Sequence, residues 1–108
     1  MKYIIKIENF KLNESSKYKH INYILINGAS GNNIFLLSVL HETEKDYYGV
    51  LNYIFTKEKG YKKKKYDNKN YNFYNKNVID ESTLFKSNNI EECFSYMNLY
   101  SASKKYNL

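Results

Sequence analysis

The sequence contains no arginine, proline, tryptophan or glutamine, and all 17 of its basic side chains are lysines. The residues that abound instead, lysine, asparagine, isoleucine, tyrosine and phenylalanine, are encoded by AT-rich codons. We therefore attribute the skewed composition to an AT-rich source genome, which also accounts for the net charge of +6. A basic chain is still attracted to nucleic acid and to acidic protein surfaces, whatever the origin of its charge.

Cysteine and long apolar stretches are also scarce. Cys93 is the only cysteine, which excludes an internal disulfide and favours a reducing cytoplasm. Lys6 and Glu8 interrupt the apolar residues near the N-terminus, so we expect no secretory signal. The longest apolar stretch, from Ile34 to Leu40, is far shorter than the roughly 20 residues that span a bilayer. We therefore expect a cytoplasmic protein that does not insert into a membrane.

The residues that are present suffice for one packed core. Of 108 residues, 43% are hydrophobic and 18% are aromatic, and this length is close to the commonest size of a single domain. We therefore predict that residues 1–108 form one domain.

Alternating apolar residues predict strands in the first half of the chain. This period-2 pattern covers residues 2–10 and 21–26. Turn-forming residues at 27–33 then lead into the apolar run 34–40, which predicts a hairpin whose third strand is central and buried on both faces. Residues 46–57 fit either a strand or a helix, and Gly49 within them favours the strand.

The last part of the chain has a helical pattern. Cys93 and Met97 lie one helical turn apart on an apolar face, and Asn88 with Glu91 matches a capping box. We therefore predict a helix over residues 89–105. The predicted fold is α+β, with an antiparallel sheet of about four to five strands and a C-terminal amphipathic helix packed on one face.

The sequence offers few groups for catalysis or metal binding. His20 and His41 are the only histidines, so a zinc site would need carboxylates to complete it. The segment Gly28-Ala29-Ser30-Gly31 departs from a nucleophile elbow because Asn32 replaces the required glycine, and we interpret it as a tight turn. Cys93 lies on the apolar helix face and is expected to be a core residue. We predict that the chain is not an enzyme and binds no cofactor or metal.

One segment, residues 57–76, interleaves lysines with aromatic side chains. We predict that residues 61–77 form an exposed hairpin or loop. The predicted partner-binding residues are Lys57, Lys59, Tyr61, Lys62, Lys63, Lys64, Lys65, Tyr66, Lys69, Tyr71, Phe73 and Tyr74.

Three interpretations of this segment stay open. Lysines can contact the phosphates of a backbone, and aromatic rings can stack on unpaired bases, which favours single-stranded nucleic acid as the partner. The same side chains also suit an acidic protein surface, or a solvated loop without a direct role. Because arginine is absent, contact with RNA or DNA would be made to the backbone and would be sensitive to salt.

A basic domain of this size, from an AT-rich genome and without a catalytic motif, resembles the accessory proteins of bacteriophages and mobile elements. These include inhibitors of host defence such as anti-CRISPR proteins. The resemblance rests on size and composition, and it transfers no functional residue. It implies a non-enzymatic protein in the host-cell cytoplasm that binds a larger host protein or ribonucleoprotein. The alternative is a small nucleic-acid-binding module without sequence specificity, and an exposed sheet edge could also pair two copies as a homodimer.

Overall fold

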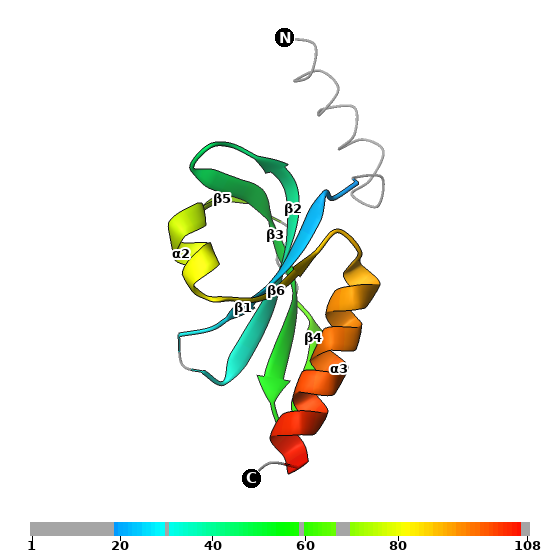
Figure 1. The fold of residues 1–108 in the computed structure, drawn as a ribbon. Helices are drawn as coiled ribbons and strands as arrows, with labels where there is room; N and C mark the ends of the chain where they lie inside the picture. Colours follow the sequence, from blue (N-terminus) through cyan, green and yellow to red (C-terminus); the bar gives the residue numbers. More distant parts are fainter. Residues whose placement is uncertain (1–18, 30, 59, 67–69, 107–108) are drawn as a thin grey trace.

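The computed structural model describes residues 19–29, 31–58, 60–66 and 70–106. These residues form an antiparallel six-stranded sheet, with a long C-terminal helix on one face and a short helix on the other (Figure 1). The predicted α+β fold is confirmed, whereas the predicted strand at 2–10 lies outside the described residues. The elements are β1 (Asn22–Asn27), β2 (Asn33–Glu42), β3 (Asp46–Lys57), β4 (Tyr61–Lys65), β5 (Asn72–Asn75), α2 (Lys76–Glu81), β6 (Thr83–Ser87) and α3 (Ile90–Tyr106).

Strand β2 is the centre of the sheet. It pairs with β1 on one side and with β3 on the other, which confirms the predicted hairpin and the strand interpretation of residues 46–57. Leu36 and Leu37 are both fully buried, each in a different hydrophobic cluster on opposite faces of the sheet. The third predicted strand is therefore buried on both faces, as expected.

Strand β3 is long enough to pair with two edge strands. Asp46 at its beginning pairs with Asn75 of β5, and Lys57 at its end pairs with Tyr61 of β4. The predicted hairpin at 61–77 is thus replaced by two strands that pair with β3 rather than with each other. A lysine-rich edge strand is stable because its backbone hydrogen bonds need no apolar side chains, and charged residues are common at sheet edges.

Helix α2 and strand β6 are both short, and the sequence did not predict them. The side chain of Asn75 caps α2 by accepting a hydrogen bond from the Val78 backbone N–H at 3.2 Å. Strand β6 then pairs with β1 at the sheet edge opposite β4. Neither element is long enough to show a clear hydrophobic period, and the apolar residues that it buries meet partners distant in sequence.

The predicted C-terminal helix is confirmed as α3, but its predicted capping box is wrong by one residue. Asn89, not Asn88, caps the helix, because its Oδ1 accepts the Glu91 backbone N–H at 2.9 Å. Glu92, not Glu91, reaches back, and its carboxylate accepts a hydrogen bond from Ser87 Oγ. Ser87 Oγ also accepts the Asn89 N–H at 3.0 Å, so Ser87 orders the entry to the helix.

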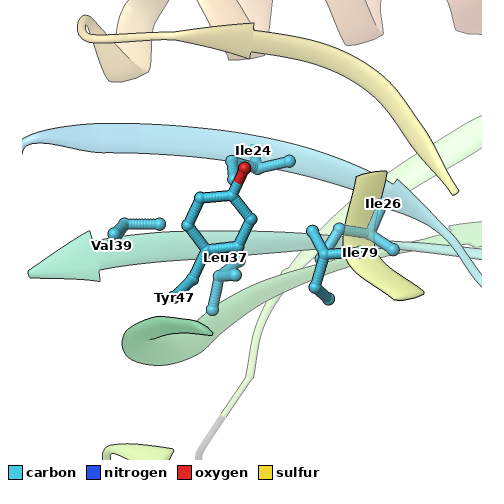
Figure 2. Close-up of a cluster of buried hydrophobic side chains, with 6 residues drawn as sticks. All are labelled: Ile24, Ile26, Leu37, Val39, Tyr47 and Ile79. Atoms are coloured by element: carbon cyan, nitrogen blue, oxygen red, sulfur yellow. The ribbon is translucent and has the colours of Figure 1, made fainter. Parts of the chain in front are cut away.

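Two hydrophobic clusters lie on opposite faces of the sheet. On the α3 face, Cys93 and Met97 pack against strand residues that include Leu25 and Leu36. On the α2 face, side chains of β1, β2 and β3 gather with one residue of α2, as Figure 2 shows for Ile24, Ile26, Leu37, Val39, Tyr47 and Ile79. Cys93 is fully buried, which confirms its predicted place in the core. Burial, with a smaller contribution from Glu92, raises the pKa of its thiol to about 11, so the thiolate is disfavoured.

Candidate binding surface at the lysine-rich sheet edge

Strand β4 distributes its lysines over both faces of the sheet. Successive strand residues point to opposite faces, so Lys62 and Lys64 share one face, and Lys63 and Lys65 share the other. Tyr66 follows the strand and continues the series of Lys62 and Lys64. Strand β4 is exposed from Lys62 onward, so its lysines do not belong to the hydrophobic core.

Lys63 is held by aromatic rings on the α3 face. Its Nζ lies 4.0 Å from the ring centroid of Phe94 in α3 and 5.6 Å from that of Tyr53 in β3. These are cation–π contacts, which also bury part of the lysine stem. Lys63 therefore joins β4 to α3, and we assign it to the fold rather than to a partner.

The beginning of β4 is attached to the last turns of α3. The Tyr61 backbone N–H donates to Ser101 Oγ at 2.6 Å, and Ser101 Oγ donates to the Tyr61 carbonyl at 3.4 Å. Gly60 has a φ of +99°, and a Cβ at this position would lie 2.6 Å from Ser101 Oγ. Only glycine therefore fits this turn without strain. As a result, α3 fixes where the lysines of β4 are placed.

On the opposite face, the side chains of β4 continue rows that cross the sheet. Lys64 pairs with Ile54 of β3, which pairs with Phe35 of β2, while Lys62 pairs with Thr56. Paired residues of antiparallel strands lie on the same face. We call the resulting surface the β4 face; it consists of Phe35, Ile54, Thr56, Lys62, Lys64 and Tyr66.

Aromatic contact orders one side of the β4 face. The rings of Phe35 and Tyr66 meet edge to face, with centroids 6.1 Å apart and an interplanar angle of 72°. The Tyr66 backbone N–H donates to the Asn52 carbonyl at 3.1 Å, which holds the residue against β3. Neither Phe35 nor Ile54 belongs to the two core clusters. The face therefore presents apolar side chains beside two exposed lysines.

The carboxylate of Glu58 lies at this surface. Glu58 is 3.7 Å from Lys64, and both side chains are about half exposed. Such a surface ion pair contributes between 0 and about 1 kcal/mol and is weakened by salt. An incoming anion can therefore replace Glu58 as the partner of Lys64 at little cost.

The other predicted partner-binding residues lie elsewhere. Tyr71 and Phe73 contact Tyr48 at the far end of β3, with ring centroids 5.7 and 4.8 Å away. His20 joins this group through a 3.1 Å hydrogen bond to the Tyr71 hydroxyl, and burial lowers its pKa. Tyr74 packs against the core cluster on the α2 face. Lys59 and Lys69 lie outside the described residues.

The structure thus divides the predicted binding segment among several places. Lys62, Lys64 and Tyr66 meet on the β4 face, while Tyr61 and Lys63 pack against α3. Phe35 and Ile54 were not predicted as site residues. Phe35 is far from β4 in sequence, and only the pairing of β2, β3 and β4 brings it and Ile54 to the same surface as the lysines.

A second polar group surrounds Tyr47 on the α2 face. The Tyr47 hydroxyl donates to Asp80 Oδ1 at 2.8 Å and accepts from Lys86 Nζ at 3.3 Å. Lys76 Nζ lies 5.2 Å from the ring centroid and is 3.0 Å from Glu42 Oε1. Burial, helped by the bond to Asp80, raises the pKa of Tyr47 to about 12. The phenol is therefore a structural donor rather than an activated base.

Tyr47→Phe is expected to change how stability depends on pH. Because the pKa of Tyr47 is about 12 in the folded protein and about 10 in an unfolded chain, the wild type loses stability as pH rises above 10. From pH 9 to pH 11 this loss is about 1 kcal/mol. The variant lacks it, so the difference in unfolding free energy between the two proteins should shrink over this range. Urea denaturation of both proteins at each pH measures this difference. A difference that stays constant from pH 9 to pH 11 would contradict the raised pKa of Tyr47.

The described residues contain neither a cluster of metal ligands nor a membrane-spanning helix. Within these residues, histidine, cysteine and carboxylate side chains form no group of three or more that could hold a metal ion. No helix among the described residues has the length and apolar character needed to cross a membrane.

Comparison of the chain with protein-family models, curated proteins and solved structures found no match.

Proposed function

We propose that this chain is a non-enzymatic binding protein that attaches through its β4 face to an anionic surface of a larger protein or ribonucleoprotein. The observation that carries the proposal is the alternation of Lys62, Lys64 and Tyr66 on a part of the sheet that neither described helix covers. The net charge of +6 acts in the same direction by attracting anionic partners over a distance.

The composition of the β4 face supports a role in binding. Phe35 and Ile54 provide apolar area, and Lys62 and Lys64 border it with charge. An apolar centre with a polar rim is the usual anatomy of a protein interface. Two residues apart on a strand, the lysines stand about 6.7 Å from each other. They can therefore contact two separate anionic groups of one partner.

The proposal extends to the biological class of the protein. A binding protein of this size and composition fits the accessory and inhibitor proteins of bacteriophages and mobile elements, including anti-CRISPR-like inhibitors. Such proteins block a larger machine by occupying a surface, for which a small, rigid, charged sheet edge is sufficient. Size, composition and the β4 face support this extension; no motif does.

Charge reversal on the β4 face tests the proposed function. In Lys62→Glu/Lys64→Glu both lysines of the face change sign, whereas Lys57→Glu/Lys65→Glu makes the same change in net charge on the α3 side. We expect the first variant to elute from a heparin column at clearly lower salt than the second, because only it removes the local anion contacts. Affinity capture of the tagged wild type from a host lysate should likewise be lost in the first variant and retained in the second.

Two results would count against the proposal. If both double variants elute together, net charge alone explains the retention and the β4 face has no part in it. If the first variant still captures the same partners as the wild type, the partner binds elsewhere. Thermal unfolding of each variant, which should stay close to that of the wild type, shows that the fold is intact.

A further inference from the structure

We infer that the β4 face binds single-stranded nucleic acid, with Lys62 and Lys64 on the phosphates and the ring of Tyr66 stacked on an unpaired base. This inference rests on the proposed function and names the chemical class of the anionic partner.

The position of Tyr66 is the first argument. The residue is 37% exposed, although its ring contacts Phe35. The edge-to-face contact leaves the ring ordered but not covered, and the backbone hydrogen bond to Asn52 fixes the residue at the end of β4. An ordered, accessible ring loses little conformational freedom when a base stacks on it.

The arrangement of charge around this ring is the second argument. Lys62, Lys64 and Tyr66 occupy every second position on one face, so a bound strand meets two cations and then an aromatic ring along one line. A single strand offers this combination, because its phosphates and its bases are both accessible. In a duplex the bases are stacked on one another, so an aromatic ring cannot reach their faces without unpairing.

The kind of cation is the third argument. Lysine is a compact charge that binds phosphate without demanding a particular geometry, whereas arginine binds phosphate and carboxylate groups bidentately in a fixed geometry. Both cations of the β4 face are lysines, and the chain has no arginine. Contacts of these lysines to a phosphate backbone would therefore be non-directional and would not depend on the sequence of the strand. The same absence removes the usual bidentate contact to guanine, so we expect binding without sequence preference.

The experiment compares single strands, duplexes and matched aromatic variants. Fluorescence anisotropy would follow binding of labelled oligo-dT and oligo-U of about 16 nucleotides, within the range that one small sheet domain covers, and of a duplex of the same length. We expect the wild type to prefer the single strands. Tyr66→Ala should weaken single-strand binding roughly tenfold with little effect on the duplex, and Tyr66→Phe should retain it.

Phe73→Ala is the matched control. Phe73 is also an exposed aromatic residue next to β3, with 62% of its surface accessible, but it lies at the opposite end of that strand. Its replacement should leave both affinities unchanged. Lys62→Gln/Lys64→Gln should reduce the slope of log affinity against log salt by about 1.4, because about 0.7 is lost for each phosphate contact to a single strand.

The outcomes separate this inference from the proposed function. If the wild type binds single strand and duplex equally and Tyr66→Ala changes nothing, the stacking inference is overturned while the anionic surface remains. If the wild type binds neither oligonucleotide but the lysine-dependent capture of an acidic protein survives nuclease, the partner class is wrong and the proposed function stands. If heparin and all oligonucleotides fail to bind and capture does not depend on the lysines, both this inference and the proposed function are wrong.

Discussion

Gly49→Ala is expected to lower the free energy of unfolding by about 3 kcal/mol or more, at the upper end of the cost of overpacking a core. Gly49 pairs with Val39 in the centre of the sheet. A Cβ at this position would lie 2.2 Å from the Ser38 carbonyl oxygen and 3.0 Å from both the Ser38 carbonyl carbon and Val39 Cα. These are backbone atoms of β2, so relief of the clash requires the two central strands to move apart.

Urea denaturation of Gly49→Ala beside Gly31→Ala measures this effect. Gly31 has a φ of +77°, but a Cβ there has no neighbour within 4 Å. Its replacement therefore carries only the cost of a left-handed backbone, about 1 to 2 kcal/mol. A Gly49 variant as stable as the Gly31 variant would show that β2 and β3 can separate easily, contrary to the close approach in the structure.

Leu36→Ala and Leu37→Ala are each expected to cost about 2 to 5 kcal/mol, although the two residues are adjacent in the sequence. Both side chains are fully buried, Leu36 against the cluster that contains Cys93 and Met97, and Leu37 in the cluster around Tyr47. Each substitution leaves a cavity on a different face of β2. In a sheet with only one covered face, one of the two changes would be nearly neutral.

Leu99→Ala is the control for these two substitutions. Leu99 lies on α3 with 74% of its surface exposed, so removing the same atoms should change stability by no more than about 0.5 kcal/mol. The midpoint and slope of urea denaturation measure all three variants. If Leu37→Ala proved as mild as Leu99→Ala, the cluster on the α2 face would not contribute to a second core layer.

Within the described residues, the elements that the sequence predicts correctly each have a local pattern of apolar residues. Strand β2 contains the apolar run 34–40, and α3 carries Cys93 and Met97 one helical turn apart, and both patterns are local properties of the sequence. The elements that were missed, α2 and β6, have six and five residues. Elements of this length are stabilised by tertiary packing rather than by propensity.

The cap of α3 shows the limit of local reasoning. Asn88 and Asn89 are adjacent and chemically identical, and Glu91 and Glu92 follow them at the same spacing. The sequence therefore allows two capping boxes. Ser87, which ends β6, donates to the Glu92 carboxylate and accepts the Asn89 N–H, and these two hydrogen bonds select Asn89 as the cap.

The same limit applies to the candidate site. The composition of residues 57–76 identifies a basic and aromatic segment. It does not distinguish lysines that pack against the protein's own aromatic rings from lysines that are exposed to a partner. Lys63 is held by Phe94 and Tyr53, whereas Lys64 faces the other way beside an exposed glutamate. This distinction needs the position of α3, which lies about thirty residues further along the chain.

By itself, the sequence determined that the described part of this chain is α+β, with a hairpin, a central buried strand and a C-terminal helix, because each of these has a local pattern. Tertiary structure alone decided which side chains form the β4 face. Leu51 and Tyr53 belong to opposite core clusters although they are two residues apart, since the pairing of β2 with β3 shifts register between Leu36 and Leu37. Such a bulge exchanges the faces of all later residues in the strand. The bulge places Ile54 beside Lys64, on the face of the sheet away from α3. No local pattern in the sequence encodes this shift in register.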